Sequence, residues 1–378
     1  MKNPFENKAF GLYIHIPFCS LKCNYCAFNV NILKTIPEEA YLEKLIEELK
    51  LYKDKKFKTI YIGGGTPNLL SNKFYSELLK HIDTSKVEEI TIELNPEFVT
   101  SEQIAFYKSL QINRFSLGVQ TFDENGIKIL GRNHNNKDAL NAIEILKNEN
   151  YSFDLIYGYP NQSIENLQDD LRQIKKINPA HLSIYNLSYE EGAFFYKWKK
   201  TGKIKALDDE LELEMYKLIN KEVEKVGLKR YEISNFSKTN KQSLHNMLYW
   251  TSHPYIGVGV GAHGYYYEDN FILRTENEKK LRKYLKLPLS EIKKINILDD
   301  KDYVFDRFYS EMRKLYIDID DFLLHTDIDL LNIFSDEFIK NKKIQSFIFI
   351  ENRNLKLTNL GVINSDIIFD IFYDYIIN

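Results

Sequence analysis

The regular alternation of short apolar runs with longer amphipathic segments is the feature of this chain that most constrains its fold. Runs rich in β-branched and aromatic residues predict six strands, at 12–16, 59–62, 89–94, 114–119, 153–157 and 181–187. Amphipathic segments predict helices at 36–52, 72–82, 101–110, 137–148, 164–177 and 208–226. Alternating strands and helices form parallel sheets with right-handed crossovers, so we expect an α/β fold, a partial (β/α)6 barrel that is open on one side.

Two helix starts carry capping signals. Thr35 and Glu38 fit a capping box with Pro37 in the first turn of the helix, and Thr100 is placed to cap the helix at 101–110. Beyond about residue 190 the pattern is less regular, and it predicts a hairpin at 346–357. The sequence therefore predicts three parts, a core at 1–265, a connecting segment at 266–298, and a small, mainly helical, winged-helix-like domain at 299–378.

Net charge and hydropathy exclude several classes of partner. The formal net charge of −3 gives no electrostatic reason to expect binding to nucleic acid or to an anionic membrane. No apolar run approaches the roughly 20 residues that a membrane span requires. The first residues lack the charged and apolar regions of a signal peptide, so we expect a cytoplasmic location.

All three cysteines of the chain lie close together, at Cys19, Cys23 and Cys26. Their odd number and tight spacing argue against a disulfide framework and favour metal binding. An iron–sulfur cube takes one thiolate for each iron that the protein binds, so three thiolates would leave one iron open for a small ligand. The alternative is a zinc site completed by His15, although structural zinc ligands usually come as two separated pairs.

Polar and glycine-rich motifs follow the predicted strands. The cysteines follow the first strand, Gly63-Gly64-Gly65-Thr66 the second, Asn95 the third and Gln120 the fourth. Because the carboxyl ends of parallel strands meet at one edge of the sheet, where ligands bind, we expect these residues to form one site.

The spacing Cys-x3-Cys-x2-Cys after a first strand resembles the signature of the radical-SAM family. The preceding residues, Tyr13-Ile14-His15-Ile16-Pro17-Phe18, resemble the oxygen-independent coproporphyrinogen oxidase group, and the likeness extends over about 13–264. It implies that the cysteines bind a [4Fe-4S] cluster and that S-adenosylmethionine (SAM) chelates the open iron. It also implies an electron donor for the cluster, whose electron cleaves SAM to methionine and a 5′-deoxyadenosyl radical.

The resemblance also implies cofactor-binding residues. Those matching contacts to the SAM on the cluster are Tyr13, Tyr25, Gly64 and Glu93. Those matching a second, nearby SAM site are Gly65, Thr66, Gln120, Arg132 and Asp154.

Two features favour a heme-chaperone subgroup over the decarboxylating enzymes of the same group. Phe28 stands where the decarboxylases carry a fourth cysteine, and residues 245–250 read His-Asn-Met-Leu-Tyr-Trp, a string typical of the chaperones. Neutral imidazole is a good heme ligand, so His245 is the heme candidate, with His263 as a rival. We expect His134 and His253 to be structural.

The sequence leaves three functions open. The favoured one is a chaperone that binds heme and transfers it to an acceptor protein, which leaves open whether the chain is an enzyme. The others are oxidative decarboxylation of coproporphyrinogen III and a different radical-SAM reaction. The favoured function implies a heme acceptor, for which respiratory heme proteins are candidates, a contact with the membrane surface, and dimerisation on heme or cofactor binding.

Overall fold

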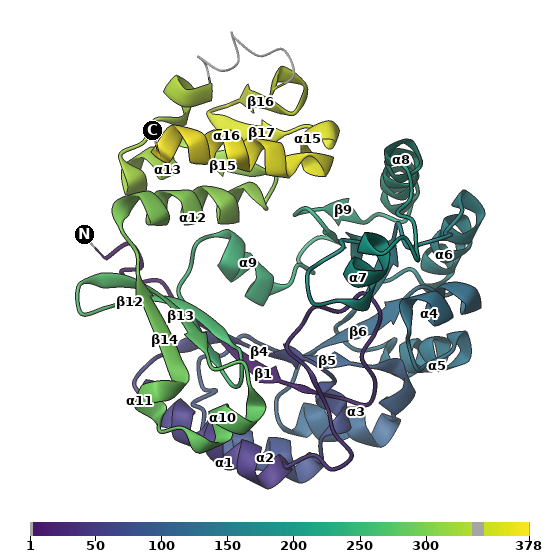
Figure 1. The fold of residues 1–378 in the computed structure, drawn as a ribbon, viewed down its shortest axis with the longest axis vertical. Coiled ribbons are helices and arrows are strands. Elements are labelled where there is room, and N and C mark those ends of the chain that lie inside the picture. Colours follow the sequence, from purple (N-terminus) through teal and green to yellow (C-terminus); the bar gives the residue numbers. More distant parts are fainter. Residues whose placement is uncertain (1–2, 335–343, 378) are drawn as a thin grey trace.

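The computed structural model describes residues 3–334 and 344–377, and its largest element is a twelve-stranded sheet (Figure 1). Seven neighbouring strands are parallel, in the order β11 (Tyr255–Val258), β1 (Phe10–Ile16), β4 (Phe57–Gly64), β5 (Glu89–Leu94), β6 (Arg114–Gln120), β7 (Tyr151–Tyr157) and β8 (His181–Asn186). Antiparallel strands extend the sheet at both edges, β12 (His263–Glu268), β13 (Phe271–Asn277) and β14 (Lys293–Ile297) beyond β11, and β10 (Asn235–Ser237) and β9 (Lys229–Arg230) beyond β8.

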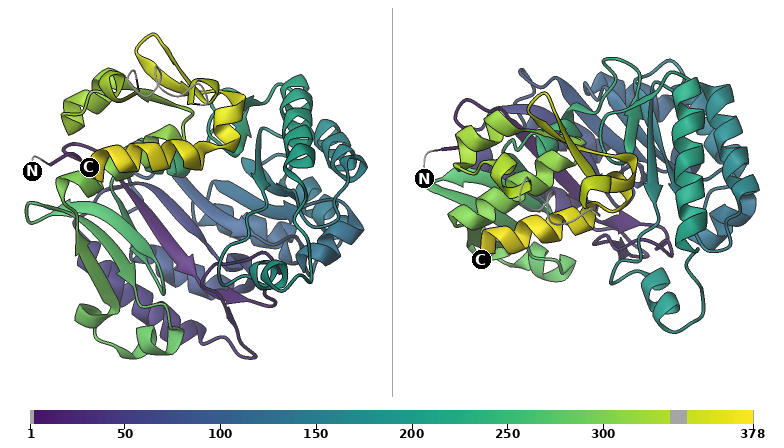
Figure 2. Two further views of the ribbon diagram at one scale, coloured as in Figure 1. Left: turned by 45° about the horizontal axis from the view of Figure 1, so that its top comes forward. Right: turned by 90° about the horizontal axis from the view of Figure 1, so that it is seen from above.

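Helices cover the outer face of this curved sheet (Figures 1 and 2). They are α1 (Glu38–Leu49), α2 (Asn72–Lys80), α3 (Ser101–Ser109), α4 (Glu124–Leu130), α5 (Asn136–Leu146), α6 (Ile164–Ile177) and α8 (Asp209–Lys225). The strand side chains that face these helices are apolar and form the core of the barrel. Leu12, Ile14 and Ile16 of β1, for example, are completely buried.

The structure confirms the α/β class and all six predicted strands, but a seventh parallel strand was not predicted. β11 pairs with β1 on the side away from β4. It lies in a glycine-rich stretch, which sequence patterns assign to loops. Gly257 is required there because a Cβ at this position would lie 1.9 Å from the carbonyl oxygen of His263 on the adjacent strand.

One of the two predicted helix caps is confirmed and the other is wrong. The Thr100 hydroxyl accepts a hydrogen bond from the Gln103 amide at 3.1 Å, as expected of an N-cap. At α1, however, Pro37 is the N-cap residue and no side chain caps the helix. Glu38 instead accepts hydrogen bonds from the amide and hydroxyl of Ser71, at 3.2 and 2.6 Å, so its carboxylate supports the start of α2.

The C-terminal part is mainly helical and contains a small sheet. Its elements are α12 (Asp300–Met312), β15 (Tyr316–Asp318), α13 (Ile319–Thr326), β16 (Ile348–Glu351), β17 (Asn354–Leu357), α15 (Asn359–Ile363) and α16 (Ser365–Ile377). The strands β16 and β17 pair antiparallel, which confirms the predicted hairpin. The helix α9 (Leu244–Trp250) lies between α12 and the barrel (Figure 1). In the part of the chain that the structure describes, no helix is long and apolar enough to cross a membrane.

Candidate functional site

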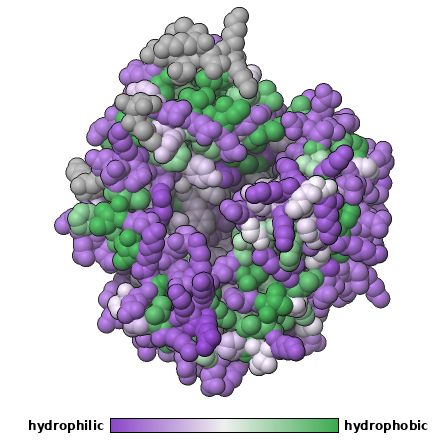
Figure 3. Space-filling view, viewed as in Figure 1, coloured by the Kyte–Doolittle hydropathy of each residue, from purple (hydrophilic) through white to green (hydrophobic). Residues whose placement is uncertain are grey.

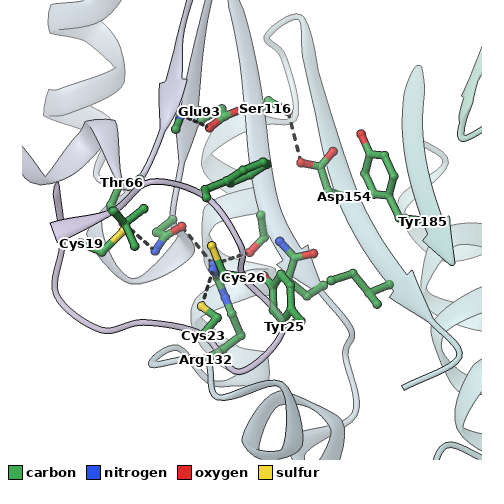
Figure 4. A pocket seen from close by; sticks show the side chains of 18 of the residues that line it. Cys19, Cys23, Tyr25, Cys26, Thr66, Glu93, Ser116, Arg132, Asp154 and Tyr185 are labelled. Atoms are coloured by element: carbon green, nitrogen blue, oxygen red, sulfur yellow. Dashed lines mark hydrogen bonds between the residues drawn. The ribbon is translucent and has the colours of Figure 1, made fainter. Parts of the chain in front are cut away.

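A pocket of about 400 Å³ opens at the carboxyl ends of the parallel strands (Figure 4). Every predicted cofactor residue except Tyr13 contributes to its lining: Cys19, Cys23, Tyr25, Cys26, Gly64, Gly65, Thr66, Glu93, Gln120, Arg132 and Asp154. The pocket brings together residues from the cysteine loop (residues 17–30) and from the ends of β4, β5, β6 and β7. The predicted convergence of strand ends on one site is therefore present in the structure.

The glycine-rich segment after β4 holds the cysteine loop in place. The Gly65 amide donates to the Ile16 carbonyl at 2.7 Å, and the Thr66 amide donates to the Phe18 carbonyl at 2.8 Å. A Cβ on Gly65 would lie 2.6 Å from the Phe18 oxygen and 3.0 Å from the Cys19 sulfur. These two amides thus support the metal-binding loop, while the same residues form part of the pocket wall.

Gly64 requires glycine for a different reason. Its φ of +113° is a conformation that L side chains rarely adopt, and a Cβ there would lie 2.5 Å from the His15 ring. Its amide donates to Glu93 Oε2 at 2.9 Å. The tight turn therefore fixes the orientation of the Glu93 carboxylate at the pocket wall.

The surroundings of His15 argue against the zinc alternative. Among the described residues, no group of three or more His, Cys, Asp or Glu side chains is gathered around one metal position. A cube spreads its ligands, because each thiolate binds a different iron. The zinc alternative also needs His15, whose Nδ1 hydrogen-bonds the Tyr13 hydroxyl and whose Nε2 hydrogen-bonds the Asn29 carbonyl, both at 2.9 Å.

Two side chains donate hydrogen bonds to cysteine sulfurs. Thr66 Oγ1 donates to Cys19 Sγ at 3.4 Å, and Arg132 Nη1 donates to Cys23 Sγ at 3.5 Å. Burial raises the pKa of Cys19 to about 11 and also raises the pKa of Cys26. Without metal these two thiols, Cys19 and Cys26, are protonated at neutral pH, so cluster binding must release protons.

Asn95 connects these two donors, and no sequence signal assigned it this role. Its Nδ2 donates to Thr66 Oγ1 at 3.3 Å, and its Oδ1 accepts from Arg132 Nη2 at 3.0 Å. Asn68 holds Asn95 from the other side, since its side chain bonds both the amide and the carbonyl of Asn95, at 2.9 and 3.0 Å. Asn95 was recognisable only as a polar residue directly after a predicted strand.

The pocket lining also contains two carboxylates and a residue with a left-handed backbone conformation. Burial raises the pKa of Glu93 to about 6, although Tyr61 donates to it at 2.8 Å, and burial also raises the pKa of Asp154. Ser116 donates to Asp154 at 3.4 Å. Gln120 has φ +70° and lies at a register shift between β6 and β7, a bulge that redirects its side chain.

Comparison with known proteins identifies the family. Residues 13–174 match the radical SAM superfamily. Heme chaperone HemW of Buchnera aphidicola subsp. Acyrthosiphon pisum is 38% identical over 80% of this chain and 82% of its own length. HemW of Escherichia coli is 34% identical over 78% and 80%, respectively. The chain belongs to the HemW family. The resemblance stated from the sequence is thereby confirmed, as are the cofactors that the superfamily implies, a [4Fe-4S] cluster and SAM.

The fold is also that of a solved structure. Coproporphyrinogen III oxidase HemN of Escherichia coli superposes with a TM-score of 0.81, covering 97% of this chain and 90% of that chain. Their sequence identity is 19%, so this likeness concerns the fold alone. It confirms the radical-SAM barrel with its helical C-terminal part.

The HemW-type string at 245–250 forms α9, and its histidine is enclosed. His245 is 1% exposed. Its Nδ1 hydrogen-bonds Thr59 Oγ1 at 2.7 Å and its Nε2 hydrogen-bonds the Tyr249 hydroxyl at 2.8 Å. Burial lowers the pKa of His245 to about 3, so the ring is neutral. Heme ligation by His245 stays a prediction, and it would require one of these hydrogen bonds to break.

The remaining residues that the sequence analysis singled out, one tyrosine and three histidines, differ in their burial and hydrogen bonds. Tyr13 lies outside the pocket lining, where its hydroxyl bonds His15 and its ring stacks on Tyr61. His134 is buried and its Nε2 hydrogen-bonds the Val119 carbonyl at 3.0 Å. His253 hydrogen-bonds Thr251 through Nδ1. His263 is the exposed member of this set.

Proposed function

We propose that this protein binds heme and transfers it to an acceptor protein, with its cluster and SAM bound beside the heme. The observation that carries the proposal is the 34–38% identity to proteins named heme chaperone HemW, over about four fifths of both chains. Identity at this level, over about four fifths of the chain, supports a shared activity, which the likeness in fold to HemN does not.

Phe28 supports the same choice. It lines the pocket beside Cys26, and 67% of its surface is exposed. The decarboxylases that the sequence resembles have a cysteine at this position. An exposed phenyl ring provides flat apolar surface of the kind that a porphyrin covers, whereas it offers no thiol chemistry.

The pocket residues receive the roles that the family implies. The three cysteines bind the cluster, Tyr25, Gly64 and Glu93 contact the SAM on it, and Gly65, Thr66, Gln120, Arg132 and Asp154 border a second SAM-sized space. Tyr13 lies outside the pocket lining, so its contact with SAM stays a prediction from the resemblance. When bound, the cluster would supply electrons for redox chemistry at SAM, so the cluster and SAM would have a gating or redox role in heme transfer. The chain's own residues hold the ligands in place, Glu93 by facing a cationic SAM group and Arg132 by offering a guanidinium to a carboxylate.

A direct experiment tests the proposal. Protein reconstituted anaerobically should bind hemin at a fixed stoichiometry, measured by titration of the Soret band. With SAM, reductant and coproporphyrinogen III it should yield no protoporphyrinogen. A product lighter by two decarboxylations, seen by mass spectrometry, would replace the chaperone by the decarboxylase.

Finer features of the proposal concern partners and organisation. We propose a respiratory heme protein as acceptor, an external electron donor, dimerisation on heme or cofactor binding, and a peripheral membrane contact. We also propose the division into a core at 1–265, a connecting segment at 266–298 and a C-terminal domain at 299–378.

A further inference from the structure

The strand β14 lies at one end of the twelve-stranded sheet and leaves an edge of it open. Its inner edge pairs with β13, and within the described ranges no strand pairs with its outer edge. The Leu298 amide donates to the Ile272 carbonyl, so the backbone groups of the even-numbered residues of β14 point to β13. The N–H and C=O groups of Lys293, Ile295 and Ile297 therefore point away from the sheet, where a further strand can bond them.

Large apolar side chains lie beside this open edge. Ile295 and Ile297 are 54% and 59% exposed, and Phe271 of β13 is 50% exposed. Ile297 lies opposite Leu273 in the β13–β14 register, so the odd-numbered residues of both strands point to one face of the sheet. Green side chains gather over this part of the sheet at the left of Figure 3. The edge thus combines unpaired backbone groups with exposed apolar surface.

Edge strands that stay unpaired are usually protected by charged side chains, and the middle of β14 has no such protection. Lys293 does not shield the edge, because its ammonium lies 3.2 Å from the buried Glu48 carboxylate and only 9% of its side chain is exposed. Lys294 is exposed, but it points to the face opposite Ile295 and Ile297. The isoleucine face of the strand is therefore open to a partner.

The charges of this segment match those of a second copy of the same segment. Lys293 and Lys294 begin the strand, and Asp299 and Asp300 follow its end. In an antiparallel pair of two copies, the lysine end of one copy lies beside the aspartate end of the other. A parallel pair would instead bring like charges together, which is destabilising. The segment is therefore complementary to itself in the antiparallel orientation.

The outward backbone groups limit the register of such a pair. Hydrogen-bonded residues of an antiparallel pair lie directly opposite each other, so odd-numbered residues must face odd-numbered ones. A two-fold axis at Asn296 meets this condition. It places Ile295 opposite Ile297 of the second copy and Lys293 opposite Asp299, so that apolar and charged groups are both matched. An axis at Ile295 or Ile297 would set an isoleucine opposite Lys293 or Asp299.

We infer that the protein forms a two-fold symmetric dimer in which β14 pairs antiparallel with β14 of a second copy, so that one sheet runs through both molecules. The inference deepens the dimerisation proposed above and rests on that proposal. Two short strands bury less surface than the about 1,600 Å² of a standard stable interface, so we expect a dimer that dissociates on dilution.

Sedimentation velocity of the reconstituted full chain, with and without hemin, measures this dimer at concentrations from about 1 to 100 µM. Ile295→Pro removes an outward N–H and keeps the bonds to β13, since proline is tolerated where the N–H of an edge strand faces solvent. Ile297→Lys adds positive charge on both sides of the axis. In each variant the dissociation constant of the dimer should rise at least about tenfold. Leu324→Lys, at a side chain of α13 that is 77% exposed, should keep the wild-type value.

A cysteine at the axis tests the register itself. Opposite residues of a non-hydrogen-bonded antiparallel pair have Cα atoms about 4.5 Å apart, within the range of a disulfide. Asn296→Cys should therefore give a disulfide-linked dimer on a non-reducing gel. Lys294→Cys, exposed on the same face, would lie roughly 13 Å along the strands from its equivalent and should give none.

The cross-linking uses reconstituted protein and a disulfide-exchange reagent under anaerobic conditions, so that the native cysteines stay bound to the cluster. Wild-type protein treated in the same way reports any cross-link through those cysteines. Iron content and thermal unfolding show whether each variant is folded. If Ile295→Pro is destabilised, Ile297→Lys and the Asn296→Cys cross-link decide the matter.

The outcomes separate the interface from the proposal on which it rests. A wild-type chain that stays monomeric under every condition would remove the dimerisation and leave the edge to a strand of a different protein. A dimer that is unchanged in Ile295→Pro and Ile297→Lys, or that cross-links equally through Lys294→Cys, would overturn only the pairing through β14. Hemin titration is an independent measurement, so neither result decides the heme-chaperone function.

Discussion

At the scale of single residues, Asn95 connects the two side chains that donate hydrogen bonds to the cysteine sulfurs. One carboxamide bonds both Thr66 and Arg132, and each of these donates to a different cysteine sulfur. Hydrogen bonds to the sulfurs are one of the means by which a protein tunes the reduction potential of an iron–sulfur cluster. Asn95 therefore acts on the cluster through other residues, as a positioning residue.

We expect Asn95→Ala to lose cluster iron faster to a chelator and to lower the midpoint potential of the cluster, because both sulfur donors lose their support. Asn95→Asp keeps an acceptor for Arg132 but lacks the donor to Thr66 and adds a negative charge near the cluster, so it should also lower the midpoint potential. Redox titration followed by EPR measures both changes. Asn125→Ala, an exposed substitution on α4, is the matched control, and potentials equal to its value in both Asn95 variants would contradict the role.

Glu93 gives the site a dependence on pH. Its pKa is raised to about 6, first by burial, so the carboxylate is charged above this pH and neutral below it. If Glu93 faces a cationic group of SAM, the affinity for SAM is constant above about pH 6 and falls as the pH is lowered through that value, by at most about tenfold per unit. Equilibrium binding between about pH 5 and 8 should show this slope, and Glu93→Gln should bind SAM more weakly with no slope there. An unchanged slope in Glu93→Gln would assign the titration to another group.

At the scale of elements, the sequence was sufficient where the apolar pattern was long and uninterrupted. All six predicted strands and the helices between them are present because each strand packs a run of apolar side chains against the outer helices, and this burial leaves a clear pattern in the sequence. β11 was missed because Gly257 is needed for the close approach of β12, and glycine weakens a strand pattern. The predicted cap at Thr35 is wrong because the Glu38 carboxylate bonds Ser71, a residue distant in the sequence, and does not bond the backbone of Thr35.

For the site, too, the sequence predicted what depends on local patterns and missed contacts between residues that are distant in the chain. The pocket lining could be predicted because strand ends and motif order determine it. The link through Asn95 and the enclosed state of His245 depend on side-chain partners from other elements. His245 bonds Thr59 of β4, and Asn95 bonds Arg132 of the loop after α4. Such pairs leave no mark in the spacing of a single sequence.

At the scale of the whole molecule, the C-terminal part shares a hydrophobic cluster with the barrel. Phe308 and Ile317 belong to the same cluster as Phe5, Tyr265 and Ile272. Arg274 of β13 also forms an ion pair with Asp306 of α12. The two parts therefore bury apolar surface against each other and stabilise each other.

We accordingly expect the full chain to unfold in one cooperative transition in scanning calorimetry. Tyr265→Ala, which removes a buried aromatic ring from the shared cluster, should lower the midpoint of that transition as a whole. Two resolved transitions, of which Tyr265→Ala moved only one, would show that the parts are thermodynamically independent. Leu324→Ala, at a side chain that is 77% exposed, provides the control.

The bonds from Gly65 and Thr66 to the carbonyls of Ile16 and Phe18 involve backbone atoms alone, so their formation does not require iron. When oxygen destroys the cluster, the cysteine loop should therefore keep its conformation. A protein molecule that has lost its cluster would then need only iron and sulfide to rebuild it, because the loop that binds the cluster is already folded. Repair of existing molecules would thus replace synthesis of new ones after oxidative stress.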